Sequence, residues 1–194
     1  SISIEAESRW KVVEEAWRSK LSVNLLEYVD GEFISLDTQS NGRVNLRSAI
    51  DVLIPYQRQK CFYCNRKLNR KADSQDDDFP DVDHFFPLSQ MGSTHFHGIN
   101  PNGVWNLVVA CKKCNRGNDG KFDMPADKIY YDKLLSRNLY FFEEHRHSLK
   151  NSILLSLNLN PSNSNAKGII RRIRYIYNYF SVLVPWKPKE IFEP

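Results

Sequence analysis

Apolar and polar positions follow two different periods along the chain, and each period predicts a type of element. Residues 5–21 carry apolar side chains at the three- and four-residue spacing of an amphipathic helix. Residues 25–36 hold two alternating runs around an Asp-Gly pair, which is typical of a β-hairpin. Residues 45–59 have a helical pattern in their first half, and Pro55 is expected to kink or end that helix. We therefore expect residues 1–57 to form a helix, a hairpin and a second helix.

The central segment, residues 58–125, has the pattern of two short strands followed by a helix. Residues 81–86 are predicted to form the first strand, which Pro87 ends. Residues 104–111 are predicted to form the second strand, and the helix is expected to start within 114–119. Polar or glycine-rich stretches between these elements predict loops at residues 65–80 and 88–103.

The last segment, residues 126–194, is helical in character, with predicted helices at 126–149, 151–159 and 166–184. In the last of these, apolar side chains at helical spacing are expected to pack inward while arginines between them face solvent. The whole pattern predicts an α+β protein. Its small two-strand core carries an N-terminal helix and hairpin and a helical C-terminal extension.

Length and composition narrow the class of protein. The 194 residues suffice for about one domain with a sizeable core. No apolar run approaches the roughly 18 residues of a membrane-spanning helix, so no membrane partner is expected. The chain starts at Ser1 without a visible leader, so we expect a cytoplasmic location, and the sequence can be an excerpt of a longer polypeptide.

Charge is distributed unevenly. A net charge of +4 and a pI near 8.8 permit a nucleic-acid partner without requiring one. The segment from Arg58 to Lys71 has six basic and no acidic residues, and that from Asp73 to Asp83 has six aspartates and no basic residues. Such runs are typical of solvated surfaces and also of nucleic-acid contacts, and the sequence leaves both readings open.

The cysteines form two Cys-x-x-Cys pairs with none left over: Cys61, Cys64, Cys111 and Cys114. A secreted protein would use such pairs as disulfides, and a redox protein would use one pair. Two pairs in a chain without a leader instead predict a four-thiolate Zn²⁺ site. Four sulfurs leave no open position on the metal, so the zinc is expected to be structural. Its expected contribution to folding is on the order of 10 kcal/mol.

Between the two cysteine pairs lie three polar signals in a fixed order. Asp83 and His84 precede two phenylalanines and a proline, Asn106 precedes a leucine, and the second cysteine pair runs directly into Asn115. This order resembles the HNH endonucleases, also called ββα-metal nucleases, including the HNH domain of RNA-guided CRISPR effectors. The resemblance covers roughly residues 58–122, about a third of the chain.

The resemblance implies that the chain cuts DNA with one divalent metal under the scissile phosphate and leaves 5′-phosphate and 3′-hydroxyl ends. His84, with a pKa expected near neutrality, suits the role of general base. The oxygens of Asp83 and Asn115 suit a catalytic Mg²⁺ or Mn²⁺. An amide at position 115, where many members carry histidine, shifts the preference toward these harder metals. By resemblance, Asn106 holds the loop after the first strand and does not touch the metal.

Other residues have weaker claims on a role. Arg116 and Lys121 are candidate phosphate contacts. Arginines of the last helix are also candidates, unless they only face solvent: Arg171, Arg172 and Arg174. The remaining histidines are not expected to be ligands: His95, His97, His145 and His147.

The predicted function is a DNA endonuclease that serves as the cutting module of a bacterial or phage defence or restriction system. RNA is an alternative substrate, and a larger targeting protein or domain is the expected partner. Paired cuts would need a dimer. The rival prediction is a zinc-ribbon module that binds nucleic acid without catalysis.

Overall fold

The computed structural model describes residues 46–47, 49–92, 94–143 and 149–193. The predicted helix of residues 5–21 and the predicted hairpin of residues 25–36 lie outside the described residues, as do His145 and His147. Throughout the described ranges the chain combines helices with one small sheet, so the α+β class is confirmed.

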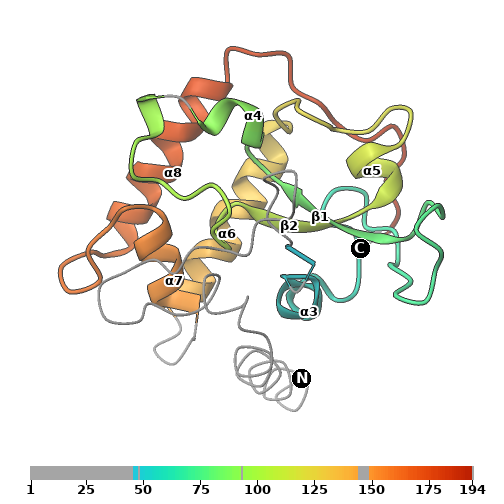
Figure 1. Cartoon of the computed structure of the whole chain (residues 1–194), viewed down its shortest axis with the longest axis horizontal. Helices are drawn as coiled ribbons and strands as arrows, with labels where there is room; N and C mark the ends of the chain where they lie inside the picture. Colours follow the sequence, from blue (N-terminus) through green and yellow to red (C-terminus); the bar gives the residue numbers. More distant parts are fainter. Residues whose placement is uncertain (1–45, 48, 93, 144–148, 194) are drawn as a thin grey trace, which may run out of the picture.

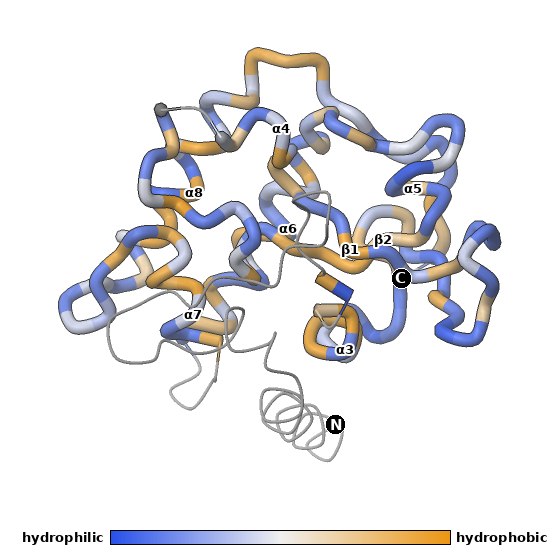
Figure 2. The backbone as a smooth tube through the Cα atoms, viewed as in Figure 1, coloured by the Kyte–Doolittle hydropathy of each residue, from blue (hydrophilic) through white to orange (hydrophobic). Residues whose placement is uncertain are grey.

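The sheet consists of two antiparallel strands, β1 (Pro80–His84) and β2 (Leu107–Cys111), in the centre of the molecule (Figure 1). Their register pairs Pro80 with Cys111 and His84 with Leu107. Every residue of β2 is buried, because its sequence LVVAC is apolar throughout and both of its faces are covered. The hydropathy colours of Figure 2 mark this central stretch as hydrophobic.

Both strands are shorter at one end than the sequence predicted. The second begins at Leu107 instead of residue 104, because Asn106 donates its backbone N–H to Gly103 O at 2.9 Å and closes a turn there. The first ends at His84, where Phe85 donates its N–H to Asn106 O at 2.7 Å. Neighbouring side chains at this end of the sheet therefore depend on turns and not on the strand ladder.

Short helices cover the N-terminal side of the sheet. Helix α3 (Ala49–Leu53) packs on both strands, and the 3-10 turn η1 (Ile54–Gln57) follows it with Pro55 in its first turn, at the expected end of the helix. The side-chain amide of Gln57 donates to Val109 O at 2.6 Å and accepts from Val109 N at 2.9 Å. This amide thus occupies the outer edge of β2 as a further strand would.

Helix α5 (Lys112–Arg116) follows β2 without a loop and begins two residues before the predicted range. The segment predicted as a loop between the strands contains two short helical turns, α4 (Leu88–Met91) and η2 (Thr94–Phe96). Elements of four or three residues carry too little periodicity to be recognised in sequence.

Three longer helices form the C-terminal part: α6 (Lys128–Glu143), α7 (Leu149–Ser156) and α8 (Ala166–Phe180). Asn165 caps α8 by accepting the N–H of Gly168 at 3.1 Å. The inward packing predicted for this helix is confirmed by four buried side chains: Ile169, Ile173, Ile176 and Phe180. One hydrophobic core extends from α3 to Trp186 and joins all three predicted segments.

Residues 181–193 leave α8 and cross the molecule to the region of α5 (Figure 1). Trp186 anchors this segment, since its N–H bonds Pro125 O at 2.7 Å and its indole N–H bonds Asp119 O at 2.7 Å. Further along, Phe192 donates its N–H to Cys64 O at 2.8 Å. We call residues 187–193 the C-terminal strap. Within the described part of the chain, no helix has the length and apolar character to cross a membrane.

Candidate functional site

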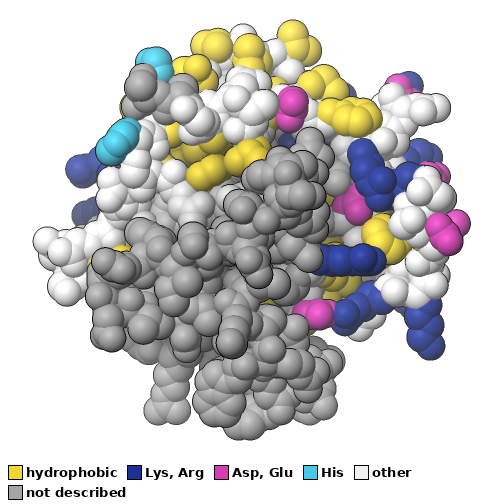
Figure 3. All heavy atoms as spheres, viewed as in Figure 1, with side chains coloured by type: hydrophobic (Ala, Val, Ile, Leu, Met, Phe, Trp, Pro, Cys, Tyr) yellow, Lys and Arg dark blue, Asp and Glu magenta, His cyan; other side chains and the backbone are white. Residues whose placement is uncertain are grey.

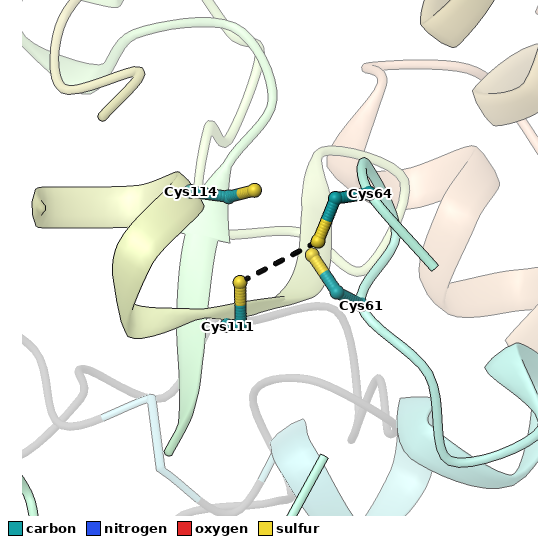
Figure 4. A group of neighbouring side chains, drawn as sticks. All are labelled: Cys61, Cys64, Cys111 and Cys114. Atoms are coloured by element: carbon teal, nitrogen blue, oxygen red, sulfur yellow. Dashed lines mark hydrogen bonds between the residues drawn. The ribbon is translucent and has the colours of Figure 1, made fainter. Parts of the chain in front are cut away.

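Four buried cysteine side chains converge on one point from two segments (Figure 4). Their sulfur atoms all lie within 4.8 Å of one another, and Cys64 Sγ is 3.7 Å from Cys111 Sγ. A tetrahedral Zn²⁺ with Zn–S bonds of about 2.3 Å needs sulfur separations of about 3.8 Å. The cluster therefore has the ligands and dimensions to hold a metal ion such as zinc.

Local backbone structure aims each pair of sulfurs. The first pair lies on a tight turn, in which Cys61 N–H bonds Arg66 O at 2.8 Å and Asn65, at φ 61°, reverses the chain. The second pair spans a strand-to-helix junction, with Cys111 ending β2 and Cys114 inside α5. The N–H of Phe62 bonds Val109 O at 2.9 Å and joins the turn to the sheet.

The thiols also influence one another electrostatically. Contact with Cys111 lowers the pKa of Cys64, and contact with Cys111 raises the pKa of Cys114. One thiol of the cluster is thus readily ionised while another resists ionisation beside its neighbours. A bound divalent cation would remove that conflict by compensating the negative charge.

A second site is a cleft of about 870 Å³ along β1. It brings together residues from three distant segments: Asp81, Asp83, His84, Asn102 and Asn115. The sequence placed three of these, Asp83, His84 and Asn115, in the candidate catalytic site. Asp81 and Asn102 were missed, although the spacing of Asp81 two residues before Asp83 puts both on one face of a strand.

The carboxylate of Asp83 points into a buried network instead of standing free in the cleft. Its Oδ2 accepts the hydroxyl hydrogen of Tyr63 at 2.5 Å, and Lys121 Nζ lies 3.1 Å from the same oxygen. Burial and the Asp83 charge hold the pKa of Tyr63 well above 10, so the phenol stays a donor. Only 6% of Asp83 is exposed. The metal-ligand role of Asp83 stays a prediction, and a metal there would have to replace one of these partners.

Lys121 is not a phosphate contact, and that prediction was wrong. Its side chain is completely buried, and its ammonium donates to Asp83 Oδ1 at 3.2 Å, His84 O at 2.9 Å and Phe122 O at 3.3 Å. The ammonium has its partners inside the protein, so none of it faces solvent. Lys121 instead ties the end of β1 to the turn after α5.

His84 extends its ring to the opposite wall of the cleft, where Nε2 lies 2.8 Å from Asn102 Oδ1. With the amide oxygen as acceptor, Nε2 carries the proton and Nδ1 keeps a free lone pair. Burial lowers the pKa of His84 from its usual 6.5, and the hydrogen bond to Asn102 opposes this shift without cancelling it. The imidazole is therefore neutral at pH 7, the protonation state that a general base requires.

On the α5 side of the cleft, Asn115 and Arg116 both contact Asp81. The amide of Asn115 is 3.3 Å from Asp81 Oδ2, and Arg116 Nε donates to the same oxygen at 2.6 Å. The pKa of Arg116 is raised by this hydrogen bond. Two carboxylates and an amide are a hard donor set that suits Mg²⁺ or Mn²⁺, although each carboxylate already has a cationic partner.

Asn106 makes the contacts expected of it. Fully buried, it accepts the N–H of Phe86 at 2.8 Å and donates to Phe86 O at 3.1 Å and Pro101 O at 3.0 Å. This holds together the two loops that carry His84 and Asn102. The backbone part of the prediction is confirmed, and the link to catalysis stays a prediction.

The other candidates lie outside the cleft. On α8, Arg171 and Arg174 are exposed, and Arg172 donates to Asn158 O at 3.5 Å. Exposed His95 lies against the ring of Tyr179 with centroids 5.5 Å apart, and His97 is exposed. The structure does not bring these residues to the site formed by β1 and α5.

Comparisons with known proteins do not supply a relative: no family model, no curated protein sequence and no solved structure matches this chain.

Proposed function

We propose that this protein is a metal-dependent endonuclease that hydrolyses phosphodiester bonds in DNA, with His84 as the general base. The observation that carries the proposal is the neutral imidazole of His84, oriented by Asn102 in a cleft that also presents Asp81, Asp83 and Asn115. The order of these residues along the chain, which resembles the HNH endonucleases, supports the same activity.

In the proposed reaction, Nδ1 of His84 accepts a proton from a water molecule. The water oxygen attacks the scissile phosphorus, the bond to the 3′-oxygen breaks, and that oxygen takes up a proton as it leaves. Asp81, Asp83 and Asn115 are the residues that would hold a catalytic Mg²⁺ or Mn²⁺. Such an ion supplies charge neutralisation on the phosphoryl oxygens and the leaving oxygen.

Nicking of supercoiled plasmid DNA in the presence of Mg²⁺ or Mn²⁺ tests this function. His84→Ala is expected to lower the rate by about 10²- to 10⁴-fold, the usual contribution of a general base. His97→Ala is the matched control, because His97 is an exposed histidine outside the cleft, and it should nick at the normal rate. Equal rates for both variants would exclude His84 as the base.

A second candidate function has an observation in its favour. Asp83 is paired with Lys121, and Asp81 with Arg116, so cations already neutralise both carboxylates of the cleft. This arrangement suits a four-cysteine module that binds nucleic acid without cutting it. Binding of DNA with no nicking under any metal would favour this second function over the nuclease.

A further inference from the structure

A second cavity, of about 490 Å³, lies beside α5 next to the cysteine cluster. It is rich in basic side chains: Arg66, Lys112, Lys113, Arg116 and Lys189. Arg116 lines both this cavity and the cleft, so the two hollows are neighbours across α5. Figure 3 shows Lys and Arg side chains gathered on the side of the molecule that carries α5. We call this cavity the basic cavity.

Glu190 of the C-terminal strap sits among these basic groups. Its Oε2 is 3.3 Å from Arg66 Nη2 and 3.4 Å from Lys113 Nζ, so one carboxylate oxygen meets two cations. The Glu190 side chain is 54% exposed, and exposed ion pairs contribute only about 0.2–1 kcal/mol each. The contact is therefore weak enough for another anion to replace it.

The strap does not depend on Glu190 for its position. Phe192 donates its N–H to Cys64 O at 2.8 Å, and the amide of Asn65 donates to Phe192 O at 3.3 Å. The guanidinium of Arg66 also lies over the Phe192 ring, 4.5 Å from its centroid. Removing the charge of Glu190 should therefore change the electrostatics of the basic cavity and leave its walls in place.

We propose that the basic cavity docks the phosphodiester backbone of duplex DNA, and that the Glu190 carboxylate holds the place of a phosphate until DNA displaces it. The inference rests on the proposed function, because Arg116 connects this surface to the cleft where the same backbone would be cut. Lys and Arg side chains around an anion-sized hollow match the regular negative charge of a DNA strand.

The arginines of α8 do not extend this surface. Helix α8 and helix α5 lie on opposite sides of the molecule in Figure 1, and Arg171, Arg172 and Arg174 line neither the basic cavity nor the cleft. A DNA strand that follows α5 therefore leaves α8 uncovered.

Binding of a short fluorescein-labelled DNA duplex, measured by fluorescence anisotropy without added magnesium or manganese, tests the docking surface. Helix α6 supplies matched controls, because Lys128 and Asp132 form an exposed ion pair at 2.6 Å outside both hollows. Glu190→Gln is compared with Asp132→Asn, which removes the same charge. Lys113→Ala is compared with Lys128→Ala in the same way.

Glu190→Gln should bind DNA about two- to fivefold more tightly at low salt, while Asp132→Asn stays near the normal affinity. Lys113→Ala should bind more weakly and reduce the slope of log K against log salt by about 0.9, the value for one lost phosphate contact. Lys128→Ala should keep the normal slope. Equal effects within either matched pair would overturn the docking surface.

Two further results separate this inference from its alternatives. Matched-pair differences in a protein that never nicks plasmid would uphold the docking surface and reject the nuclease; nicking with no matched-pair difference would do the reverse. An RNA duplex of the same sequence is the last comparison. Tighter binding of the RNA than of the DNA would overturn the choice of DNA as the partner.

Discussion

At the scale of single residues, the buried pair of Lys121 and Asp83 determines the structure of the cleft wall. The ammonium reaches three acceptors, and two of them are backbone carbonyls on either side of the cleft. A charged group without exposure is tolerated only when such partners compensate its lost hydration. The pair therefore has a structural role that neither residue could fill alone.

Lys121→Met should destabilise the fold by about 3–5 kcal/mol, because it leaves the Asp83 carboxylate buried without its cation. Urea unfolding with linear extrapolation measures the change in the free energy of unfolding. Lys128→Met is the control, since its exposed pair with Asp132 contributes only about 0.3–0.5 kcal/mol. A normal unfolding midpoint for Lys121→Met would show that the pair does not stabilise the cleft wall.

His84 should make stability depend on pH in a definite direction. Burial holds its pKa below 6.5, so the unfolded chain takes up a proton before the folded protein does. The contribution of neutral His84 is complete above pH 6.5 and is lost as the pH falls toward the lowered pKa. Free energies of unfolding at about pH 7.5 and pH 5.5 should therefore differ less in His84→Gln than in the unmodified protein. The exposed control, His97→Gln, should keep the full difference, and equal behaviour of the two variants would contradict the shift.

At the scale of elements, α5 cannot be stable by itself. A helix of five residues is far shorter than the length at which isolated helices form in water. Its position depends on Cys114, on the sheet that leads into it, and on the turn that returns Lys121 N–H to Cys114 O at 2.7 Å. Because Asn115 and Arg116 stand on this helix, the cysteine cluster sets where one wall of the cleft lies.

The cysteine cluster is expected to bind one zinc ion per chain, and its removal by a chelator should unfold α5 and the turn of the first cysteine pair. Metal analysis measures the ion, and urea unfolding measures the loss of stability, which is expected to be a large part of the total. Zinc should restore the fold and magnesium should not, because four thiolates prefer the softer ion. An unchanged unfolding midpoint after chelation, or after Cys114→Ser, would contradict a structural metal site.

At the scale of the whole molecule, the chain closes on itself around the cysteine cluster. The C-terminal strap returns from α8 to the first cysteine turn, so residues more than a hundred positions apart in sequence lie together. It covers the cluster with Phe192 and adds the acidic Glu190 to a basic surface. The strap therefore links the stability of the metal site to the charge of the proposed DNA surface.

Ending the chain after Lys187 should make the cysteine cluster release its metal faster, since the strap no longer shields Cys64. Transfer of zinc to a coloured chelator, followed by absorbance, measures the rate. Ile191→Ala is the control, because this strap side chain is 64% exposed and its loss uncovers little. Equal release rates for the truncated and full chains would show that the strap does not protect the cluster.

The sequence by itself determined the features that depend on local spacing. Two cysteines three positions apart share one side of a tight turn wherever that turn lies, and apolar residues at helical spacing share one face of α8. The α+β class, the close approach of the four cysteines and the inward face of α8 follow from such short-range geometry, and the structure confirms them.

Only the tertiary structure decided which partner each polar group of the cleft meets. Tyr63 and Lys121 reach Asp83 across 20 and 38 positions, and the sequence pattern around Lys121, a polar turn, is the same for a buried and a solvated lysine. The pairing of His84 with Asn102, and of Glu190 with Arg66, likewise depends on how separate segments pack. The physical reason is that burial and electrostatic partners come from the folding of the whole chain, whereas periodicity records only each element's own geometry.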